Sequence, residues 1–295
     1  MNLRLLLMLA ALCGITARAF PLGPTAPDRG STGAAAKAPP EYLTLNPGDQ
    51  VDLSPGPVHF SGHPVFLKPT ARKWLYRAAA PGHTKVRVGS PEHARTIVIF
   101  VAPTPSRQVS RHDLRWYRTQ FEGGTSDCGP ALVSMSILWA KGIDVPVRTV
   151  RSEIGYPFAN GATSLENLRV AMGRHGISAR VTRVRTPSDL VAALERGHIA
   201  LLLVRSDNID MVSGDPTENL VGRYYAYGGG HYILVKGYSL DRDYFVVFDP
   251  YPSDWEANSL RYADGETMIG ENRYYPAVQI IAALKTPDVL EVSAQ

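Results

Sequence analysis

The spacing of turn-forming residues divides this chain into two regions that cannot fold in the same way. Between Glu41 and Pro103 the apolar residues come in short alternating or β-branched runs, separated by Asn46-Pro47-Gly48, Pro55-Gly56-Pro57 and Pro81-Gly82. Short runs that are interrupted by turn chemistry are typical of strands. We therefore expect an all-β domain at residues 41–104, arranged as a small sandwich.

From about Leu114 onward the pattern changes to mixed helix and strand. The expected strands are ISARVTRV, HIALLLVRS, HYILVKGY, YFVVFDP and AVQIIAAL. The roughly 175 residues of this second region are enough to bury one independent core. We expect an α+β domain at residues 105–288, which begins with the linker PTPSRQVSRHD, and a short tail at 289–295.

Three helices are predicted in the second region. The first should follow Cys128 and stop at Gly142, because Ala131, Leu132, Met135, Leu138 and Trp139 recur with a period near 3.6. The second is expected at 163–176, where Thr163 and Glu166 form a capping box. The third is expected at 186–197, started by Thr186-Pro187 and ended by Gly197.

The N-terminus has the pattern of a secretory signal. Arg4 precedes an eleven-residue apolar run, shorter than the about 20 residues that cross a bilayer, and Ala17-Arg18-Ala19 matches the A-x-A cleavage pattern. We expect a signal peptide at 1–19 and a secreted or periplasmic bacterial protein. Lipoprotein processing at Cys13 is the alternative, but Leu12 stands where a small residue is needed. Residues 20–40, rich in Pro, Gly, Ala, Ser and Thr, are expected to form a disordered leader.

Charge argues against two classes of partner. The chain has 31 basic and 27 acidic residues, a net charge of +4, which becomes +2 when the signal is removed with Arg4 and Arg18. A balance this near to neutral makes no case for nucleic acid or an anionic membrane surface, and no later segment predicts stable membrane insertion. Removal of Cys13 leaves Cys128 as the only thiol, so an internal disulfide is not possible.

Cys128 stands where a nucleophile is expected. It lies between Asp127 and Gly129-Pro130 at the start of the first predicted helix. Free backbone N–H groups and the helix dipole at this end favour a thiolate and lower the pKa of the thiol from about 8.5. A lone cysteine is more often a small buried hydrophobe. The flanking residues and the helix-edge position favour the nucleophile here.

A thiol nucleophile needs a base, and the base needs an orienting group. His231 opens a predicted strand directly after three glycines, which would allow a substrate backbone to approach closely. In a hairpin that pairs Tyr238 with Tyr244, Asp249 lies opposite Ile233 and on the same face as His231, about 7 to 8 Å away between Cα atoms. A register slip of one residue would put the two side chains on opposite faces.

These segments carry a family resemblance. The runs QFEGGTSDCGPALVSM, TSLENLRVAMGRHGISARV, LVAALERGHIALLLV and GGGHYILVKGYSLDRDYFVVFDPYP follow the order seen in papain-like cysteine peptidases. The region from about Gln108 to Leu284 resembles the bacteriocin-processing (double-glycine leader) peptidase-like family. The resemblance implies a papain-like fold, a helical lobe plus an antiparallel sheet, that acts on a peptide or protein substrate without a cofactor or metal.

The resemblance also implies the roles of four residues. Cys128 would be the nucleophile, His231 the general base and acid, Asp249 the group that orients His231, and Gln120 the side-chain donor of the oxyanion hole. Gln120 lies eight residues before Cys128, and Gln108 is its rival.

The chain departs from the true leader peptidases, because it has no transporter segment or ATP-binding motif and carries a β domain in front. The double-glycine substrate is therefore not carried over. The stretch YRAAAPGHTKVRV resembles the closing hairpin of bacterial immunoglobulin-like domains. The sandwich is accordingly expected to be immunoglobulin-like, and it is a candidate for binding a substrate or partner protein. Two alternatives stay open: a cell-wall peptide amidase or acyl transferase using the same residues, and an inactive binding or adhesion module.

Two groups of residues have competing interpretations. His59 and His63 have a spacing that suits a metal, but no acidic or thiol partner lies nearby, so they are expected to be loop histidines. Tyr224, Tyr225 and Tyr227 precede the glycines and could equally line a substrate cleft or occupy a surface turn.

Overall fold

The computed structural model describes residues 40–61, 64–109, 115–124, 126–155, 163–251 and 261–294. The predicted signal peptide at 1–19 and the leader, apart from Pro40, lie outside the described residues.

The first region contains two β-sheets. One has the order β1 (Glu41–Leu45), β7 (Arg95–Val101), β6 (Gly82–Val88) and β3 (Val58–Phe60), and the other has the order β2 (Gln50–Asp52), β5 (Leu75–Ala78) and β4 (Leu67–Pro69). Strand β1 runs parallel to β7, whereas the other pairs are antiparallel. Buried residues of both sheets, among them Val86, Ile99 and Ala78, form one core. The immunoglobulin-like topology stays a prediction.

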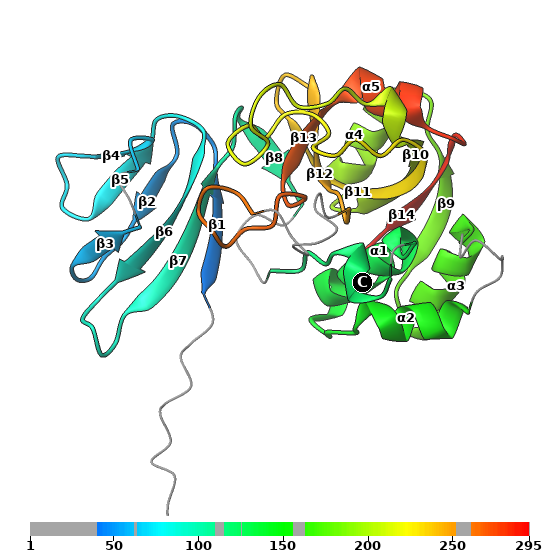
Figure 1. The fold of residues 1–295 in the computed structure, drawn as a ribbon, viewed down its shortest axis with the longest axis horizontal. Coiled ribbons are helices and arrows are strands. Elements are labelled where there is room, and N and C mark those ends of the chain that lie inside the picture. Colours follow the sequence, from blue (N-terminus) through cyan, green and yellow to red (C-terminus); the bar gives the residue numbers. More distant parts are fainter. Residues whose placement is uncertain are drawn as a thin grey trace, which may run out of the picture. The chain divides into compact units, whose positions relative to one another are not determined.

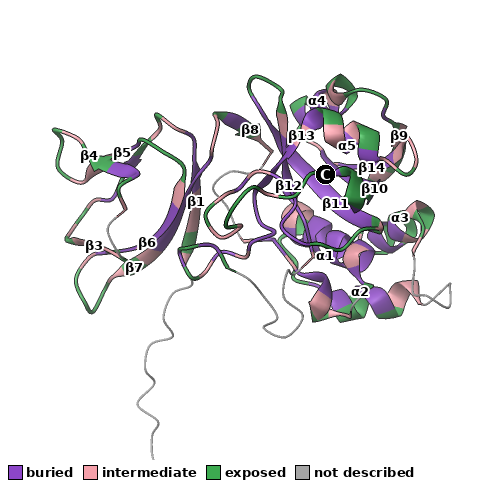
Figure 2. Cartoon of the chain, turned by 45° about the horizontal axis from the view of Figure 1, so that its top comes forward, coloured by how far each residue is buried: buried purple, intermediate pink, exposed green. Residues whose placement is uncertain are grey.

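The second region is built on one antiparallel sheet of seven strands. Its order is β13 (Arg273–Pro276), β12 (Tyr244–Phe248), β11 (Gly230–Ser239), β10 (Ile199–Arg205), β14 (Asp288–Val292) and β9 (Ala179–Arg183), and β8 (Ser106–Gln108) pairs with the far end of β11. Residues 230–239 are nearly all buried (Figure 2). A strand buried on both faces needs cover on both, and the helices provide it.

The helices cover opposite faces of this sheet (Figure 1). Helices α1 (Cys128–Lys141), α2 (Val147–Ile154) and α3 (Leu165–Arg174) pack against Leu201, Leu234 and their neighbours, whereas α4 (Pro187–Glu195) and α5 (Ala277–Ala283) pack against Leu202 and Val235. The strand residues that contact the two groups of helices alternate along each strand, because successive strand residues point to opposite faces. Two short 3₁₀ helices, η1 (Gln120–Glu122) and η2 (Ser206–Asn208), complete the region.

Several sequence predictions for this region hold. Helix α1 begins at Cys128 and ends before Gly142, whose φ of 67° is the left-handed conformation that glycine tolerates best. Helix α4 begins after Thr186, as predicted. The mixed helix and sheet architecture also agrees with the expected α+β class. The capping box of α3 is shifted by one residue, since Ser164 and Asn167 form it instead of Thr163 and Glu166.

Two other predictions were wrong. The segment AVQIIAAL was expected to be a strand but forms α5, in which Ala277, Ile280 and Ala283 are buried at helical spacing. A short apolar run fits both periods, and here the helical one prevails. The expected tail at 289–295 instead contains most of β14, an inner strand whose Val289 and Leu290 pack into opposite cores. The sequence analysis also missed α2, β13 and the strand β8 inside the expected linker.

Within the described ranges, no helix combines the length and the apolar character needed to cross a membrane.

Candidate active site

Cys128 is the first residue of α1, and it is half-buried at the helix edge. The preceding residue, Asp127, is fully buried and forms an ion pair with Arg151 of α2, which also donates to the Ser126 carbonyl at 3.0 Å. Arg151 therefore neutralises the carboxylate closest in sequence to the thiol. The unpredicted helix α2 positions this arginine, which is buried in its last turn.

His231 lies on strand β11, and Asp249 directly follows its partner strand β12. The predicted Tyr238–Tyr244 pair is not formed, since Tyr238 lies opposite Phe245. A bulge between Val235 and Gly237 then shifts the register by one residue, so that Leu234 lies opposite Phe248. Continued by one residue, this register brings Asp249 opposite Ile233, as expected from the sequence. The Nε2 atom of His231 lies 2.7 Å from Oδ1 of Asp249, and both side chains are buried.

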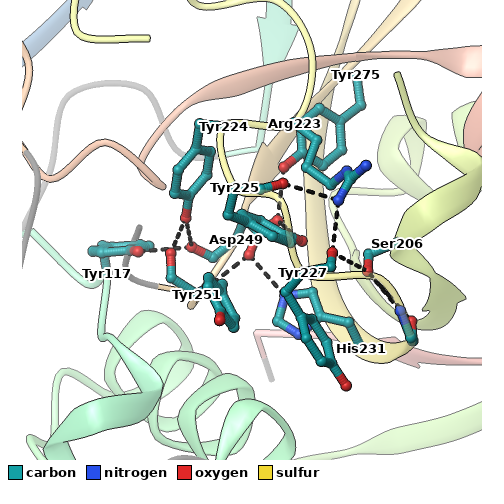
Figure 3. Close-up of polar contacts among 11 residues, drawn as sticks. Tyr117, Ser206, Arg223, Tyr224, Tyr225, Tyr227, His231, Asp249, Tyr251 and Tyr275 are labelled. Atoms are coloured by element: carbon teal, nitrogen blue, oxygen red, sulfur yellow. Dashed lines mark hydrogen bonds and ion pairs between the residues drawn. The ribbon is translucent and has the colours of Figure 1, made fainter. Parts of the chain in front are cut away.

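Every acceptor position of the Asp249 carboxylate is used (Figure 3). Oδ1 accepts from His231 and from the Tyr251 backbone N–H at 3.0 Å, and Oδ2 accepts from the hydroxyls of Tyr225 at 2.9 Å and Tyr275 at 2.7 Å. Its backbone carbonyl accepts from Tyr117 at 2.7 Å and Tyr224 at 3.1 Å. Burial and the neighbouring carboxylate raise the pKa of all four tyrosines well above 10, so their hydroxyls stay protonated donors. This arrangement fixes Asp249 in both position and charge.

The pKa values of these groups favour an ion pair. Burial lowers the pKa of His231, but the Asp249 charge and hydrogen bonds to Asp249 and Cys128 outweigh this effect and raise it to about 10. Burial raises the pKa of the Cys128 thiol, yet the hydrogen bond and charge of His231 and backbone hydrogen bonds from Tyr232 and Gly129 leave it below its usual 9.0. Burial also raises the pKa of Asp249, but the His231 charge together with hydrogen bonds from His231, Tyr275 and the Tyr251 backbone outweighs burial and lowers it. The arrangement thus favours a thiolate beside an imidazolium.

Cys128 and His231 line a cavity of about 570 Å³, and Gln120 lines it with them. Gln120 is buried in η1, where its backbone N–H donates to the Pro250 carbonyl at 2.9 Å. Its rival Gln108 does not line this cavity, since it lies on β8 opposite Gly237. The structure therefore brings together Cys128, His231, Asp249 and Gln120, and leaves Gln108 apart.

The sequence analysis missed Tyr251 and Lys285 and left Tyr227 undecided. Tyr227 and Tyr251 stack with ring centroids 5.6 Å apart and both line the cavity, as does Lys285. Tyr224 and Tyr225, whose position was undecided, are buried donors to Asp249 instead of surface residues. A cluster of tyrosines before the glycines was the only sequence signal for these contacts. Tyr275 and Lys285 had none, because they come from segments whose fold was missed or predicted incorrectly.

The spacing of His59 and His63 suits a metal ion. No group of three or more His, Cys, Asp or Glu side chains there could hold a metal ion. His59 is exposed on strand β3, opposite Arg87, and not in a loop as predicted. His63 lies outside the described residues.

Three solved structures share some similarity with this chain. A protein from Bacillus anthracis described as a C39-like peptidase is 11% identical, with a TM-score of 0.40 over 60% of this chain and 93% of that one. The peptidase domain of Streptococcus ComA, a bifunctional ABC transporter involved in quorum sensing, is 13% identical, with a TM-score of 0.36 over 58% and 93%.

A double-glycine motif protease from an AMS/PCAT transporter, solved with its leader peptide, is 15% identical, with a TM-score of 0.34 over 57% of this chain and 86% of that one. These TM-scores are too low to establish a common fold. No curated protein matches the chain.

The family model provides the decisive comparison. The model described as "Peptidase_C39 like family" matches residues 115–279, more than half of the chain, and the matched range includes Cys128, His231 and Asp249. The chain therefore belongs to the Peptidase_C39-like family and is a cysteine peptidase.

Proposed function

We propose that this protein hydrolyses a peptide or isopeptide bond through a triad of Cys128, His231 and Asp249. The observation that carries the proposal is that one buried carboxylate, saturated with donors, holds His231 by Nε2, while His231 lines one cavity with Cys128. In the proposal Nδ1 of His231 serves the Cys128 thiol, so that nucleophile, base and orienting group act as one unit.

In the proposed reaction the Cys128 thiolate attacks the carbonyl carbon of the scissile amide. The developing oxyanion accepts hydrogen bonds from the Cys128 backbone N–H and the Gln120 side chain. The His231 imidazolium gives its proton to the departing amine, which leaves a thioester on Cys128 and a neutral imidazole. His231 then takes a proton from water, the hydroxide attacks the thioester, and collapse of this second intermediate releases the carboxylic acid and restores the thiolate.

The position of Gln120 supports its proposed role. It is buried and lines the same cavity as Cys128, and its backbone is anchored to the residue that follows Asp249. A rigid side-chain donor close to the thiol stabilises charge without needing to reorganise during the reaction. Gln108 is half-buried on β8 beside a different part of β11 and is the natural control.

The test compares variants of the mature protein on a peptide library and on cell-wall peptide fragments, with the products identified by mass spectrometry. Cys128→Ala and His231→Ala should abolish cleavage, and Gln120→Ala should lower kcat by about 10² to 10³ with little change in KM. Gln108→Ala should keep wild-type kinetics. Cleavage by Cys128→Ala would overturn the proposed mechanism, and transfer of the acyl group to an amine instead of water would favour the acyl-transferase alternative.

We further propose that the protein is exported, that cleavage after Ala19 gives a mature chain starting at Phe20, and that the N-terminal sheets form an immunoglobulin-like module that binds a substrate or partner protein. The A-x-A pattern supports the cleavage site. Intact-mass analysis of the exported protein tests it: a chain that starts at a lipidated Cys13 or retains Met1 would contradict the assignment.

A further inference from the structure

One side of the cavity carries the positive charge of Lys285. Lys285 lines the cavity with Cys128 and His231, and among the described residues no acidic side chain lines it. Lys285 is exposed, and the structure shows no ion pair between it and any described residue. Its ammonium is therefore available to a ligand.

Three described acidic residues close to the site have cationic partners. Asp249 pairs with His231 at 2.7 Å, Asp127 pairs with Arg151, and Asp207, which packs beside Gly228, pairs with Arg205 at 2.9 Å. The single charge of the His231 imidazolium lies between two anions, the Asp249 carboxylate and the Cys128 thiolate. Lys285 is the other cation among the described residues that line the cavity, and the N-terminus of α1 adds a partial positive charge.

The backbone holds Lys285 in place. It follows α5, its N–H donates to the Leu203 carbonyl at 3.0 Å, and the preceding Leu284 forms a bridge with Val204 on β10. Strand β10 is the direct neighbour of β11, so this anchor sets Lys285 beside the start of the strand that carries His231.

The glycine before His231 makes room for the lysine side chain. A Cβ atom on Gly230 would lie 3.1 Å from Nζ of Lys285 and 3.5 Å from its Cδ. The ammonium thus lies across the backbone immediately next to His231. A peptide whose scissile carbonyl is at Cys128 occupies the same cavity that Lys285 lines.

We propose that Lys285 is a specificity residue that binds a carboxylate of the substrate, so that the enzyme prefers peptides with an acidic group close to the scissile bond. This inference rests on the proposed function, because it assigns the substrate class of the same site. The carboxylate can belong to an Asp or Glu side chain or to a free C-terminus, and both share the chemistry that an ammonium recognises.

The test uses peptides built around one cleaved bond, with Glu, Gln or Lys in turn at each flanking position and both ends capped. The wild-type enzyme should show kcat/KM in the order Glu, Gln, Lys at one position, with about a 5- to 10-fold step for a partly exposed pair. The step should shrink in 1 M salt, where the Debye length falls to about 3 Å. A matched series with uncapped C-termini distinguishes a side-chain carboxylate from a terminal one.

Charge reversal at Lys285 provides the decisive comparison. Lys285→Glu should invert the order to Lys, Gln, Glu, and Lys285→Gln should bring the three peptides close together. Lys68→Glu, the same change at an exposed residue of β4 that does not line the cavity, should keep the wild-type order. Cleavage without a preference for Glu at any position, or an order that Lys285→Glu leaves unchanged, would overturn the proposal.

Binding separates this inference from the proposed catalysis. The Cys128→Ala protein, with and without Lys285→Glu, is titrated with the capped Glu, Gln and Lys peptide pools by fluorescence anisotropy. Tighter binding of the Glu pool that depends on Lys285, together with no cleavage by the wild-type protein, would contradict the peptidase mechanism and support the carboxylate site. Equal binding of all three pools, together with wild-type cleavage that shows no preference for Glu, would contradict the carboxylate site and support the peptidase mechanism.

Discussion

At the scale of single residues, the site depends on how firmly Asp249 is held. Two tyrosine hydroxyls, one backbone N–H and one imidazole N–H saturate its carboxylate, and the Gly270 carbonyl accepts its backbone N–H at 2.9 Å. A buried carboxylate with this many donors stays ionised and cannot turn away from His231. The charge that raises the pKa of His231 is therefore permanent.

The first prediction concerns the pH range of activity. The thiolate–imidazolium pair exists above the pKa of Cys128, which lies below 9.0, and below the His231 pKa of about 10. The kcat/KM profile should rise on the acid side as the thiol ionises and fall as the pH passes about 10. Asp249→Asn removes the charge that raises the His231 pKa, so its alkaline limb should move to lower pH. The kcat/KM profiles of both proteins check this prediction, and an alkaline limb that Asp249→Asn leaves unmoved would contradict it. Iodoacetamide labelling of Cys128 across the same pH range follows the ionisation of the thiol.

The second prediction concerns Gly270, which packs against the Asp249 backbone. A Cβ atom here would overlap the carbonyl oxygen of Asp249 and the hydroxyls of Tyr117 and Tyr224. Gly270→Ala should therefore lower the free energy of unfolding by about 1 to 3 kcal/mol, as overpacking does, and reduce kcat/KM by displacing Asp249. Gly173→Ala is the matched control: the site in α3 is open within 4 Å, so the change should stabilise the protein by about 0.5 to 1 kcal/mol. Urea denaturation of both variants measures these changes. A Gly270→Ala protein as stable as the wild type would show that Gly270 is not tightly packed against Asp249.

Sequence reasoning brought out Cys128 and His231 as candidate residues but not all of the residues that surround them in the structure. Cys128 and His231 stand beside local signals, a helix start and a run of glycines, which are visible without knowledge of the fold. Tyr275 and Lys285 reach the site only because β13 pairs with β12 and Leu284 forms a bridge with β10. Contacts between distant segments leave no periodic pattern in a single sequence, so neither residue could be predicted.

At the scale of the elements, a bulge in the β11–β12 hairpin cancelled an error in the predicted register. Alternation placed His231 and Asp249 on one face, but the turn-end register was one residue off, because the bulge adds a residue to β11. Gly237 marks the bulge, and β8 passes so close that a Cβ there would lie 2.6 Å from the Arg107 carbonyl oxygen. Since β8 was read as a linker, the need for a glycine at this point was not visible in the sequence.

The third prediction concerns Glu291, which ties β14 to its neighbours. Its buried carboxylate accepts from Arg180 and Thr182 of β9, and from Arg196 and His198 before β10. Burial raises its pKa, but the hydrogen bonds from His198 and Arg196 prevail and lower it from 4.5 to about 2. The group thus stabilises the fold above pH 4.5, and this contribution is lost as the pH falls towards about 2.

Glu291→Gln should lower the free energy of unfolding at pH 7 by about 1 to 3 kcal/mol, because a neutral amide replaces the buried carboxylate that accepts from two arginines and a histidine. The difference from wild type should narrow as the pH falls below 4.5, as followed by urea denaturation at several pH values. Glu166→Gln, which breaks an exposed pair with Arg169, should cost no more than about 0.5 kcal/mol. Equal losses in the two variants would show that the Glu291 cluster does not hold the sheet edge together.

At the scale of the whole molecule, segments far apart in sequence share polar contacts and one core. His83 of β6 stacks on Tyr262 with ring centroids 4.2 Å apart, and its Nδ1 lies 3.4 Å from Asp264. Phe100 of β7 belongs to the same buried cluster as Tyr262. The sequence predicted the β texture of the first region, but nothing in it indicated that a histidine there would be buried against residues about 180 positions later.

The last prediction uses this histidine to measure how stability depends on pH. Burial lowers the pKa of His83 below 6.5, and the neighbouring Asp264 offsets this only in part. Above pH 6.5 the ring is neutral in both folded and unfolded chains, so it contributes no pH dependence. Below pH 6.5 the unfolded chain binds the proton more readily, and stability falls by up to about 1.4 kcal/mol per pH unit for this one proton. His231, whose pKa is raised, contributes a constant amount in this range and does not obscure the slope.

His83→Gln should therefore flatten the dependence of the unfolding free energy on pH between 6.5 and 5, whatever its effect on stability at pH 7. The slope is read from urea denaturation at several pH values, and it is independent of any loss of ring stacking. His59→Gln removes an exposed histidine from β3 of the same region and should keep the wild-type slope. If His83→Gln keeps that slope too, the ring takes up its proton as readily in the folded protein as in the unfolded chain. The contact with Tyr262 and Asp264 would then not be closed to water, and the two regions would not be joined by a buried core at this point.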